Sequence, residues 1–193
     1  MARPRVHDDA LRTRLLEVAS ETISTGGEQS LTVRAVATAA GTSASAVYAL
    51  FGSREQLLAA VSAEGFRRFA ARLQSVPRGG DPVGDLRELG RAYRDSALAD
   101  PHFYRVMFDR GVRPGPDAPD PVQQPTFLVL RDAAARVLDA PPEHVQDVAV
   151  GLWGLVHGLV SLELGGLLPG DLAARSARYD AAAGAVGPAL LAR

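Results

Sequence analysis

The apolar positions of residues 8–56 recur every three or four places, which predicts three short helices joined by tight turns. The first helix begins at Asp8 or Asp9 and ends at Gly26-Gly27. Thr32 and Ser43 are expected to cap the second and third, because a hydroxyl can accept a hydrogen bond from a free amide of the first helical turn. Gly52 ends the third helix.

The same spacing continues to the C-terminus and predicts further helices, separated by Pro77–Pro82 and by an irregular loop at Gly111–Pro125. These helices are expected at Arg54–Val76, at Val83–Leu98, from Asp100-Pro101 onward, at Thr126–Leu138, from Pro141-Pro142 onward, at Val148–Leu168 and at Asp171–Ala192. We therefore predict an all-α fold.

The stretch from Leu31 to Gln56 has the spacing of a helix-turn-helix. Gly41 suits the turn, and Val36, Val47 and Leu50 can form a small core between the two helices. The second helix could then present its other side to a DNA groove. An ordinary helical hairpin is the alternative that spacing alone leaves open.

Residues 32–58, T-V-R-A-V-A-T-A-A-G-T-S-A-S-A-V-Y-A-L-F-G-S-R-E-Q-L-L, resemble the N-terminal signature of TetR-type transcriptional regulators. The resemblance covers about the first sixty residues. It implies a three-helix DNA-binding head at 1–53 and a larger helical effector-binding and dimerisation body at 54–193. The residues it implies for DNA binding are Thr32, Arg34, Thr42, Ser43, Ala44, Ser45, Tyr48 and Arg54.

Two positions depart from the family pattern. Many members have a histidine two places after the tyrosine and a lysine at the start of the next helix, where this chain has Leu50 and Arg54. Leu50 can only pack against other apolar groups. Arg54 could still bind a phosphate, and its guanidinium can do so with two hydrogen bonds.

The segment Val148–Leu168 is apolar on every side, and its 21 residues are long enough to span a bilayer. His157 and Glu163 interrupt it and no basic cluster flanks it, so we expect a buried helix in a protein without a membrane partner. Its W-G-L-V-H-G motif resembles a Trp–His–Gly group of TetR-type C-terminal domains. This implies that the last two helices pair with a second copy through Leu155, Leu159, Leu162, Tyr179 and Val186.

Composition agrees with such a protein and restricts how it could bind DNA. The 193 residues are 47% hydrophobic, contain no cysteine and carry a net charge of −1, with every one of the 21 cations an arginine. Residues 1–56 hold six arginines and six acids. Any DNA affinity must therefore come from the placement of a few groups, among which Arg3 and Arg5 form a short N-terminal arm.

No pattern for catalysis, metal binding or a cofactor is present in the sequence, and an enzyme is not expected. One aromatic set with a single polar group is typical of an effector pocket, and ordinary core is its alternative. The set is Phe103, Tyr104, Met107, Phe108, Phe127, Trp153 and His157.

These observations together predict a cytoplasmic, homodimeric repressor that a small apolar effector releases from a palindromic double-stranded DNA operator. The alternative is a helical small-molecule-binding dimer whose head no longer binds DNA.

Overall fold

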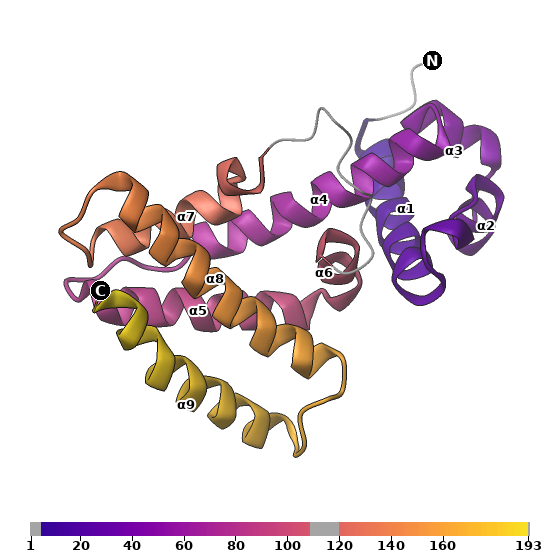
Figure 1. Ribbon diagram of the computed structural model, residues 1–193. Coiled ribbons are helices and arrows are strands. Elements are labelled where there is room, and N and C mark those ends of the chain that lie inside the picture. Colours follow the sequence, from indigo (N-terminus) through magenta and orange to yellow (C-terminus); the bar gives the residue numbers. More distant parts are fainter. Residues whose placement is uncertain (1–4, 109–119, 193) are drawn as a thin grey trace. The chain divides into compact units, whose positions relative to one another are not determined.

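A computed structural model describes residues 5–108 and 120–192, and within these residues it contains only helices (Figure 1). The all-α prediction is confirmed. The elements are α1 (Arg5–Gly26), η1 (Glu28–Ser30), α2 (Val33–Ala39), α3 (Ala44–Phe51), α4 (Arg54–Gln74), α5 (Pro82–Ala99), α6 (Pro101–Phe108), η2 (Pro121–Gln123), α7 (Pro125–Ala135), α8 (Pro142–Leu164) and α9 (Leu172–Leu191).

The chain forms two compact units. Met1–Arg68 and Asp100–Ala118 make up the first, and Phe69–Ala99 and Pro119–Arg193 make up the second. The long helix α4 contributes its first part to one unit and its last part to the other. The predicted boundary after residue 53 concerns function, and it stays a prediction.

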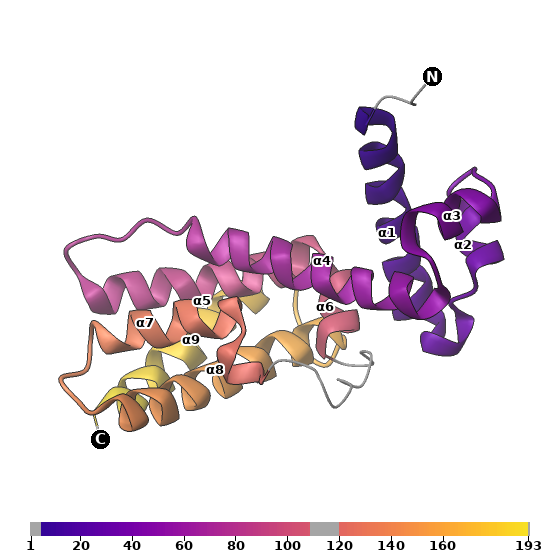
Figure 2. The same ribbon diagram turned by 90° about the horizontal axis from the view of Figure 1, so that it is seen from above.

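The first unit is built on a shared core of α1, α2, α3, the beginning of α4 and α6 (Figure 2). α6 comes from a distant part of the sequence, yet its Phe103 and Val106 are buried in the same cluster as the helix-turn-helix. The fully or nearly fully buried members of this cluster include Leu15, Leu16, Ala19, Ile23, Leu31, Val36, Val47, Leu57 and Val61.

The turn between α2 and α3 has the local chemistry that its sequence predicts. Thr32 accepts a hydrogen bond from the Ala35 amide at 3.1 Å, and Ser43 accepts one from the Ala46 amide at 3.2 Å. Gly41 has a φ of 67°, a backbone conformation that residues with a Cβ rarely adopt. The amides of Gly41 and its successor return to carbonyls of α2, which ends that helix with a Schellman motif.

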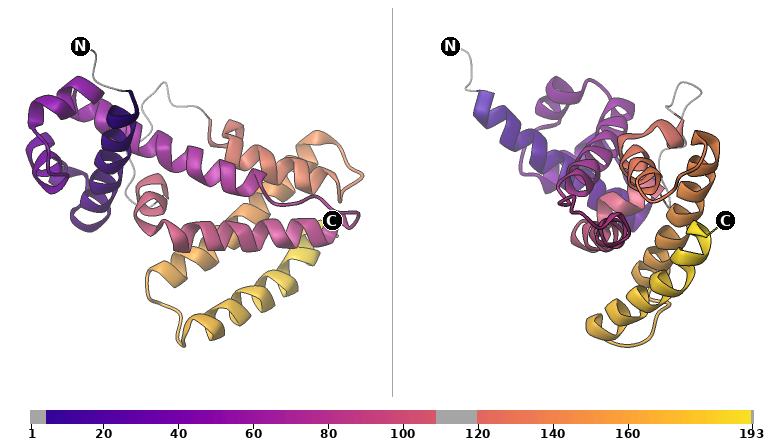
Figure 3. Two further views of the ribbon diagram at one scale, coloured as in Figure 1. Left: turned by 180° about the vertical axis from the view of Figure 1, so that it is seen from behind. Right: turned by 90° about the vertical axis from the view of Figure 1, so that its left-hand side faces the viewer.

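The second unit packs α5, α7, α8 and α9 together with the last part of α4 (Figure 3). α5 and α8 are its central helices, because they contact each other and both contact α7 and α9. One apolar cluster joins α7 to α8 and contains Phe127, Ala134, Val145, Val148, Ala149 and Leu152. The side chains of α9 are mostly small, and Tyr179 is its one buried residue.

α8 spans Pro142–Leu164, which confirms the predicted opening of a helix at Pro141-Pro142. The apolar segment predicted at Val148–Leu168 is the later part of this same helix, and its predicted end was wrong. The first turns of α8 precede the apolar segment and are polar, and proline stands at an early position, which its fixed φ suits. The helix ends earlier than predicted because Gly166 takes a φ of 70° and the Leu167 amide bonds back to the Leu162 carbonyl. Among the described residues, α8 alone is long and apolar enough to cross a membrane by length and composition.

Both polar interruptions of α8 face partners on α5. The His157 Nδ1 lies 3.2 Å from the hydroxyl of Tyr93. The Glu163 carboxylate receives two hydrogen bonds of 2.7 Å from the guanidinium of Arg94, and both side chains are buried. These contacts explain how an otherwise apolar helix can carry a histidine and a glutamate, since buried polar groups need hydrogen-bond partners.

Candidate nucleic-acid interface

Helix α3 has one buried face and one exposed face. Val47 and Phe51 are buried in the core of the first unit, and Leu50 packs against its edge. Tyr48 is 53% exposed, and among the described residues of this unit it is the only large apolar side chain so exposed. An aromatic ring with a hydroxyl on an otherwise free helix face is well suited to contact a base edge or a phosphate.

Hydroxyl groups gather at the N-terminus of α3. The Ser43 and Ser45 hydroxyls lie 3.0 Å apart, and both side chains are exposed. Thr42 and Ala44 are half-buried beside them. On α2, Thr32 and Arg34 are exposed as well. Seven of the eight residues implied for DNA binding thus lie at or next to the helix-turn-helix with some or all of their surface open.

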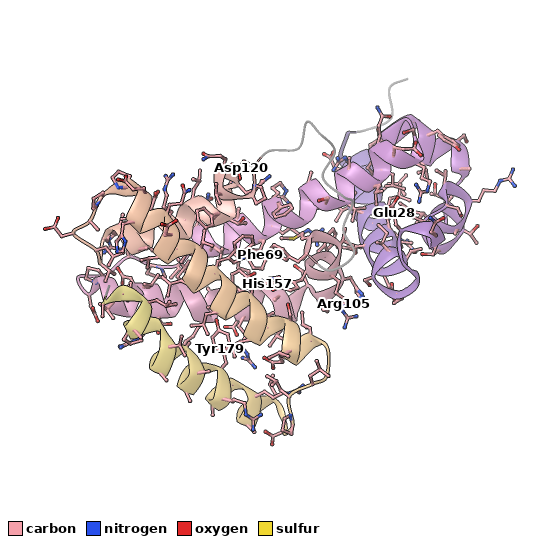
Figure 4. All side chains as sticks on the ribbon, viewed as in Figure 1. Glu28, Phe69, Arg105, Asp120, His157 and Tyr179 are labelled. Atoms are coloured by element: carbon pink, nitrogen blue, oxygen red, sulfur yellow. The ribbon has the colours of Figure 1, made fainter. Side chains whose placement is uncertain are left out.

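Arg54 is the exception, because its guanidinium is already engaged within the protein. Its Nε donates to the Leu31 carbonyl at 2.7 Å, and its Nη2 donates to the Glu28 carbonyl at 2.6 Å. Its Nη1 lies 3.7 Å from the carboxylate of Glu28, a residue that Figure 4 labels. Arg54 therefore secures the connection between α1 and α2, and we leave it out of the proposed DNA contacts.

The formal neutrality of residues 1–56 hides an uneven distribution of charge. Glu17 pairs with Arg68 at 3.4 Å, and Glu28 and Glu55 lie within 4 Å of Arg54. These ion pairs engage three of the six acids of residues 1–56. The remaining arginines whose side chains are described are 12, 14 and 34, and each is exposed. None of the three has an ion pair within the described residues. Arg3 lies outside the described residues.

Comparison with known proteins agrees with this arrangement. Residues 15–61 match the family model of bacterial regulatory proteins of the tetR family, and residues 86–185 match that of the tetracyclin repressor-like C-terminal domain. The second match alone covers more than half of the chain. The chain belongs to the TetR family. Members of this family regulate transcription and are not enzymes.

Solved structures show that the whole chain has the fold of the family. A TetR family transcription regulator from Marinobacter aquaeolei has 21% identity and a TM-score of 0.72, covering 93% of this chain and 96% of its own. PfmR, a TetR family regulator from Thermus thermophilus, has 19% identity and a TM-score of 0.68, covering 92% and 97%. A protein of unknown function from a Rhodococcus species has 25% identity and a TM-score of 0.69, covering 94% and 93%. No curated protein sequence matches significantly.

The predicted effector residues fall into two groups in this TetR-family protein. Phe103, Tyr104, Met107 and Phe108 lie on α6 in the first unit, whereas Phe127, Trp153 and His157 lie in the second. Phe103 is buried in the first unit's core with the Arg68 guanidinium 4.6 Å above its ring. The α6 group therefore helps to build the first unit, and the described structure does not join all seven residues in one compact unit.

The second group forms a continuous aromatic cluster. The rings of Phe127 and Trp153 are 6.0 Å apart, and the Trp153 indole donates to the Tyr93 hydroxyl at 3.3 Å. That hydroxyl also lies next to His157, and the centre of the Tyr93 ring is 4.9 Å from that of Phe69. Figure 4 labels Phe69 and His157. Sequence reasoning missed Tyr93, although its place on the apolar face of the predicted α5 helix was visible.

The residues predicted for a dimer interface also differ in exposure. Leu162 and Val186 are exposed, and Leu155 and Leu159 are half-buried. Tyr179 is 3% exposed, and its hydroxyl donates to the Gly90 carbonyl at 2.5 Å. Burial raises the pKa of this hydroxyl, so it stays protonated and keeps donating. Tyr179 thus joins α9 to α5 within one protomer and is not on its free surface.

Proposed function

We propose that this TetR-family protein is a homodimeric, cytoplasmic repressor that binds a palindromic DNA operator through α3 and is released by a small apolar effector. The observation that carries the DNA-binding part is the division of α3 into a buried face, with Val47 and Phe51, and an exposed face, with Ser45 and Tyr48. A helix whose one face packs on a small core can insert its other face into a major groove.

The dimer is supported by an open apolar face on α8. Val150 and Leu162 are each more than 40% exposed, and Gly154 and Gly158 lie between them at a spacing of four. A Cβ on either glycine would meet no atom within 4 Å. Small residues flanked by exposed aliphatic side chains allow another helix to approach closely. A second copy of α8 and α9 is the occupant we propose, because a two-fold dimer would also present two α3 helices to a palindrome.

The effector is proposed to bind the second unit near the cluster of Phe127, Trp153, His157 and Tyr93. Three aromatic rings with an indole donor, a hydroxyl and an imidazole provide both apolar contact and a way to orient one polar group of a ligand. Trp153 is the only tryptophan in the chain, so its fluorescence would report a ligand that binds there.

Release is proposed to pass through α4. This helix belongs to both compact units, so a change in packing around Phe69 or Leu73 in the second unit can be carried along it toward Leu57 and Val61 in the first. An effector that binds one arrangement of the units better than the other would shift the population toward that arrangement. The two α3 helices would then no longer match successive grooves.

Selection of bound sequences from random DNA, followed by a mobility-shift assay, tests the proposal. We expect a palindromic site with two half-sites about 10 base pairs apart, or a multiple of that distance. Tyr48→Ala should abolish the shift while the melting temperature stays near that of the wild type, because Tyr48 is exposed. Val47→Asp should instead unfold the first unit, since it places an unpaired charge in a buried position.

The alternative function, a small-molecule-binding dimer without DNA binding, has one observation in its favour, which is the engagement of Arg54 within the protein. It would be supported if the selection enriched no sequence while Trp153 fluorescence still responded to ligands. If instead a sequence is enriched and Tyr48→Ala binds it normally, the assignment of the DNA-facing side of α3 is wrong.

A further inference from the structure

Arg14 lies on α1 beside the turn of the helix-turn-helix. Its Nη2 is 3.9 Å from the position that a Cβ on Gly41 would occupy, and the glycine leaves this space open. Gly41 directly precedes Thr42 and Ser43, the residues that lead into α3. The neighbouring residues Leu15 and Leu16 are almost completely buried, so the backbone of α1 at Arg14 is held firmly in place.

All arginines with described side chains in the first unit except Arg14 and Arg34 have partners within the protein. Arg54 bonds to two carbonyl oxygens, and Arg67 and Arg68 share the carboxylate of Glu64. The Arg12 guanidinium lies 5.3 Å from the centre of the Phe51 ring, as a cation–π contact requires. In the described part of the chain, Arg14 and Arg34 have no such partner.

The chemistry of this position favours a phosphate over a base edge. A guanidinium presents five donors in a planar fork that matches two oxygens of a phosphate. Arg14 is on α1, outside the helix proposed to enter the groove, so it reaches the backbone of DNA bound by α3 more readily than the bases. The exposed hydroxyls of Ser43 and Ser45, which follow the turn, can also bond to a DNA backbone.

We propose that Arg14 binds a phosphate of the DNA backbone beside the α2–α3 turn and so positions α3 in the groove. This inference rests on the proposed DNA binding. Arg14 supplies affinity that does not depend on base sequence, and with Arg34 it accounts for DNA binding although residues 1–56 hold as many acids as arginines. A dimer would bring two copies of each arginine, and about four phosphates would be neutralised by these two positions.

The test compares Arg14→Gln with Arg12→Gln on the full-length protein. Arg12 lies two residues away on the same helix and is also exposed, so the pair controls for net charge. Binding constants are measured against salt concentration for the selected operator and for a scrambled duplex of the same length. We expect Arg14→Gln to weaken binding to both duplexes by a similar factor and to lower the steepness of the log–log salt dependence by about 1.8 for the dimer. Arg12→Gln should leave that steepness closer to the wild-type value.

Two further results bear on the proposal. Arg14→Lys should restore most of the salt dependence, because it keeps the charge. An Arg14→Gln protein that folds normally and has the wild-type salt dependence would overturn the proposal, and so would one whose preference between the two duplexes changes, since that would indicate a base contact. If the wild-type protein binds neither duplex, the proposed function fails as well, and the two failures are thus distinguishable.

Discussion

At the scale of a single residue, Arg54 shows how one side chain can join two segments that are distant in the sequence. Its two short hydrogen bonds reach carbonyl oxygens 23 and 26 residues earlier in the chain, at Leu31 between η1 and α2 and at Glu28, the first residue of η1. Hydrogen bonds from a charged donor are stronger than neutral ones, and the planar guanidinium loses little conformational freedom when it makes two of them. The start of α4 is therefore held against the entrance to the helix-turn-helix.

We expect Arg54→Lys to destabilise the first unit, because an ammonium cannot reproduce the two directed bonds of the fork. Arg54 is partly exposed, so the expected loss in free energy of unfolding is about 1–3 kcal/mol. Arg34→Lys is the matched control, since Arg34 is exposed and should leave the unfolding midpoint unchanged. Thermal denaturation followed by circular dichroism measures both. Equal midpoints for the two variants would contradict this role.

Glu64 should make the stability of the fold depend on pH under acidic conditions. The Arg67 guanidinium, with help from Arg68, lowers the pKa of the Glu64 carboxyl from 4.5 to about 2. A carboxyl with a lowered pKa in the folded state stabilises the fold above its unfolded pKa, and this contribution is lost as the pH falls from about 4.5 toward about 2.

The measurement compares melting temperatures of the wild type and Glu64→Gln between pH 6 and pH 2. The difference should be largest at pH 6 and should shrink through the window below pH 4.5, where the wild-type carboxylate becomes protonated. Glu21→Gln removes an exposed carboxylate that has no ion pair in the described residues, and it should give no such pattern. A difference that stays constant with pH would show that Glu64 acts by packing and not by charge.

Among the elements, α6 has a role that its place in the sequence does not suggest. It lies beyond α4 and α5 in the chain, but its buried residues complete the core under the helix-turn-helix. A 2.5 Å contact between His102 Nδ1 and the Ser24 hydroxyl joins the beginning of α6 to the end of α1. Stability of the DNA-binding unit should therefore depend on residues well outside the first sixty.

Val106→Ala tests this dependence, because Val106 is 1% exposed and belongs to the core cluster of the first unit. Removing two methyl groups from a packed core should lower the free energy of unfolding by roughly 1–3 kcal/mol. Hydrogen exchange should then show faster exchange for the amides of α1, α2 and α3. Val145→Ala makes the same change at a buried position of the second unit and should leave those amides protected. Unchanged exchange in Val106→Ala would mean that α6 is not part of the cooperative unit.

The elements that could be predicted from the sequence are those defined by local chemistry. Thr32, Ser43 and Gly41 act on amides and carbonyls a few residues away, so their roles in capping and turning were visible in the spacing. The contacts of Arg54 and Tyr179 within the protein were not predicted, because their partners lie 23 to 89 residues away, where spacing carries no signal. The aromatic set was divided between two units for the same reason: helical periodicity identifies an apolar face without showing what covers it.

For the whole molecule, the central question is what covers the open face of α8. Gly154→Leu separates folding from association, because Gly154 is exposed and a Cβ at this position would meet no other part of its own protomer within 4 Å. Leucine also has a higher helix propensity than glycine, so the isolated protomer should be as stable as before or more so, by up to about 1 kcal/mol. Association should weaken, since the leucine would fill the space that a second helix needs.

Sedimentation equilibrium at micromolar concentration measures this effect. The wild type should be a dimer, and Gly154→Leu should dissociate at higher concentrations than the wild type. Gly80→Leu is the control, because it adds the same side chain in open space on the α4–α5 loop. Leu155→Glu and Leu159→Glu should also give monomers or aggregates. A wild-type protein that is a stable monomer would contradict both the proposed dimer and the proposed release through α4.

The discontinuous first unit also has a consequence for synthesis on the ribosome. Residues up to Arg68 leave the ribosome without Phe103 and Val106, which close their core. At about 5–20 residues per second, the 38 residues from 69 to 106 take about 2–8 s to make. During this interval the nascent helix-turn-helix exposes apolar surface that the finished protein hides. Chaperones that bind nascent chains should therefore associate with this segment until α6 emerges, and a slow codon between residues 69 and 106 should lengthen that association.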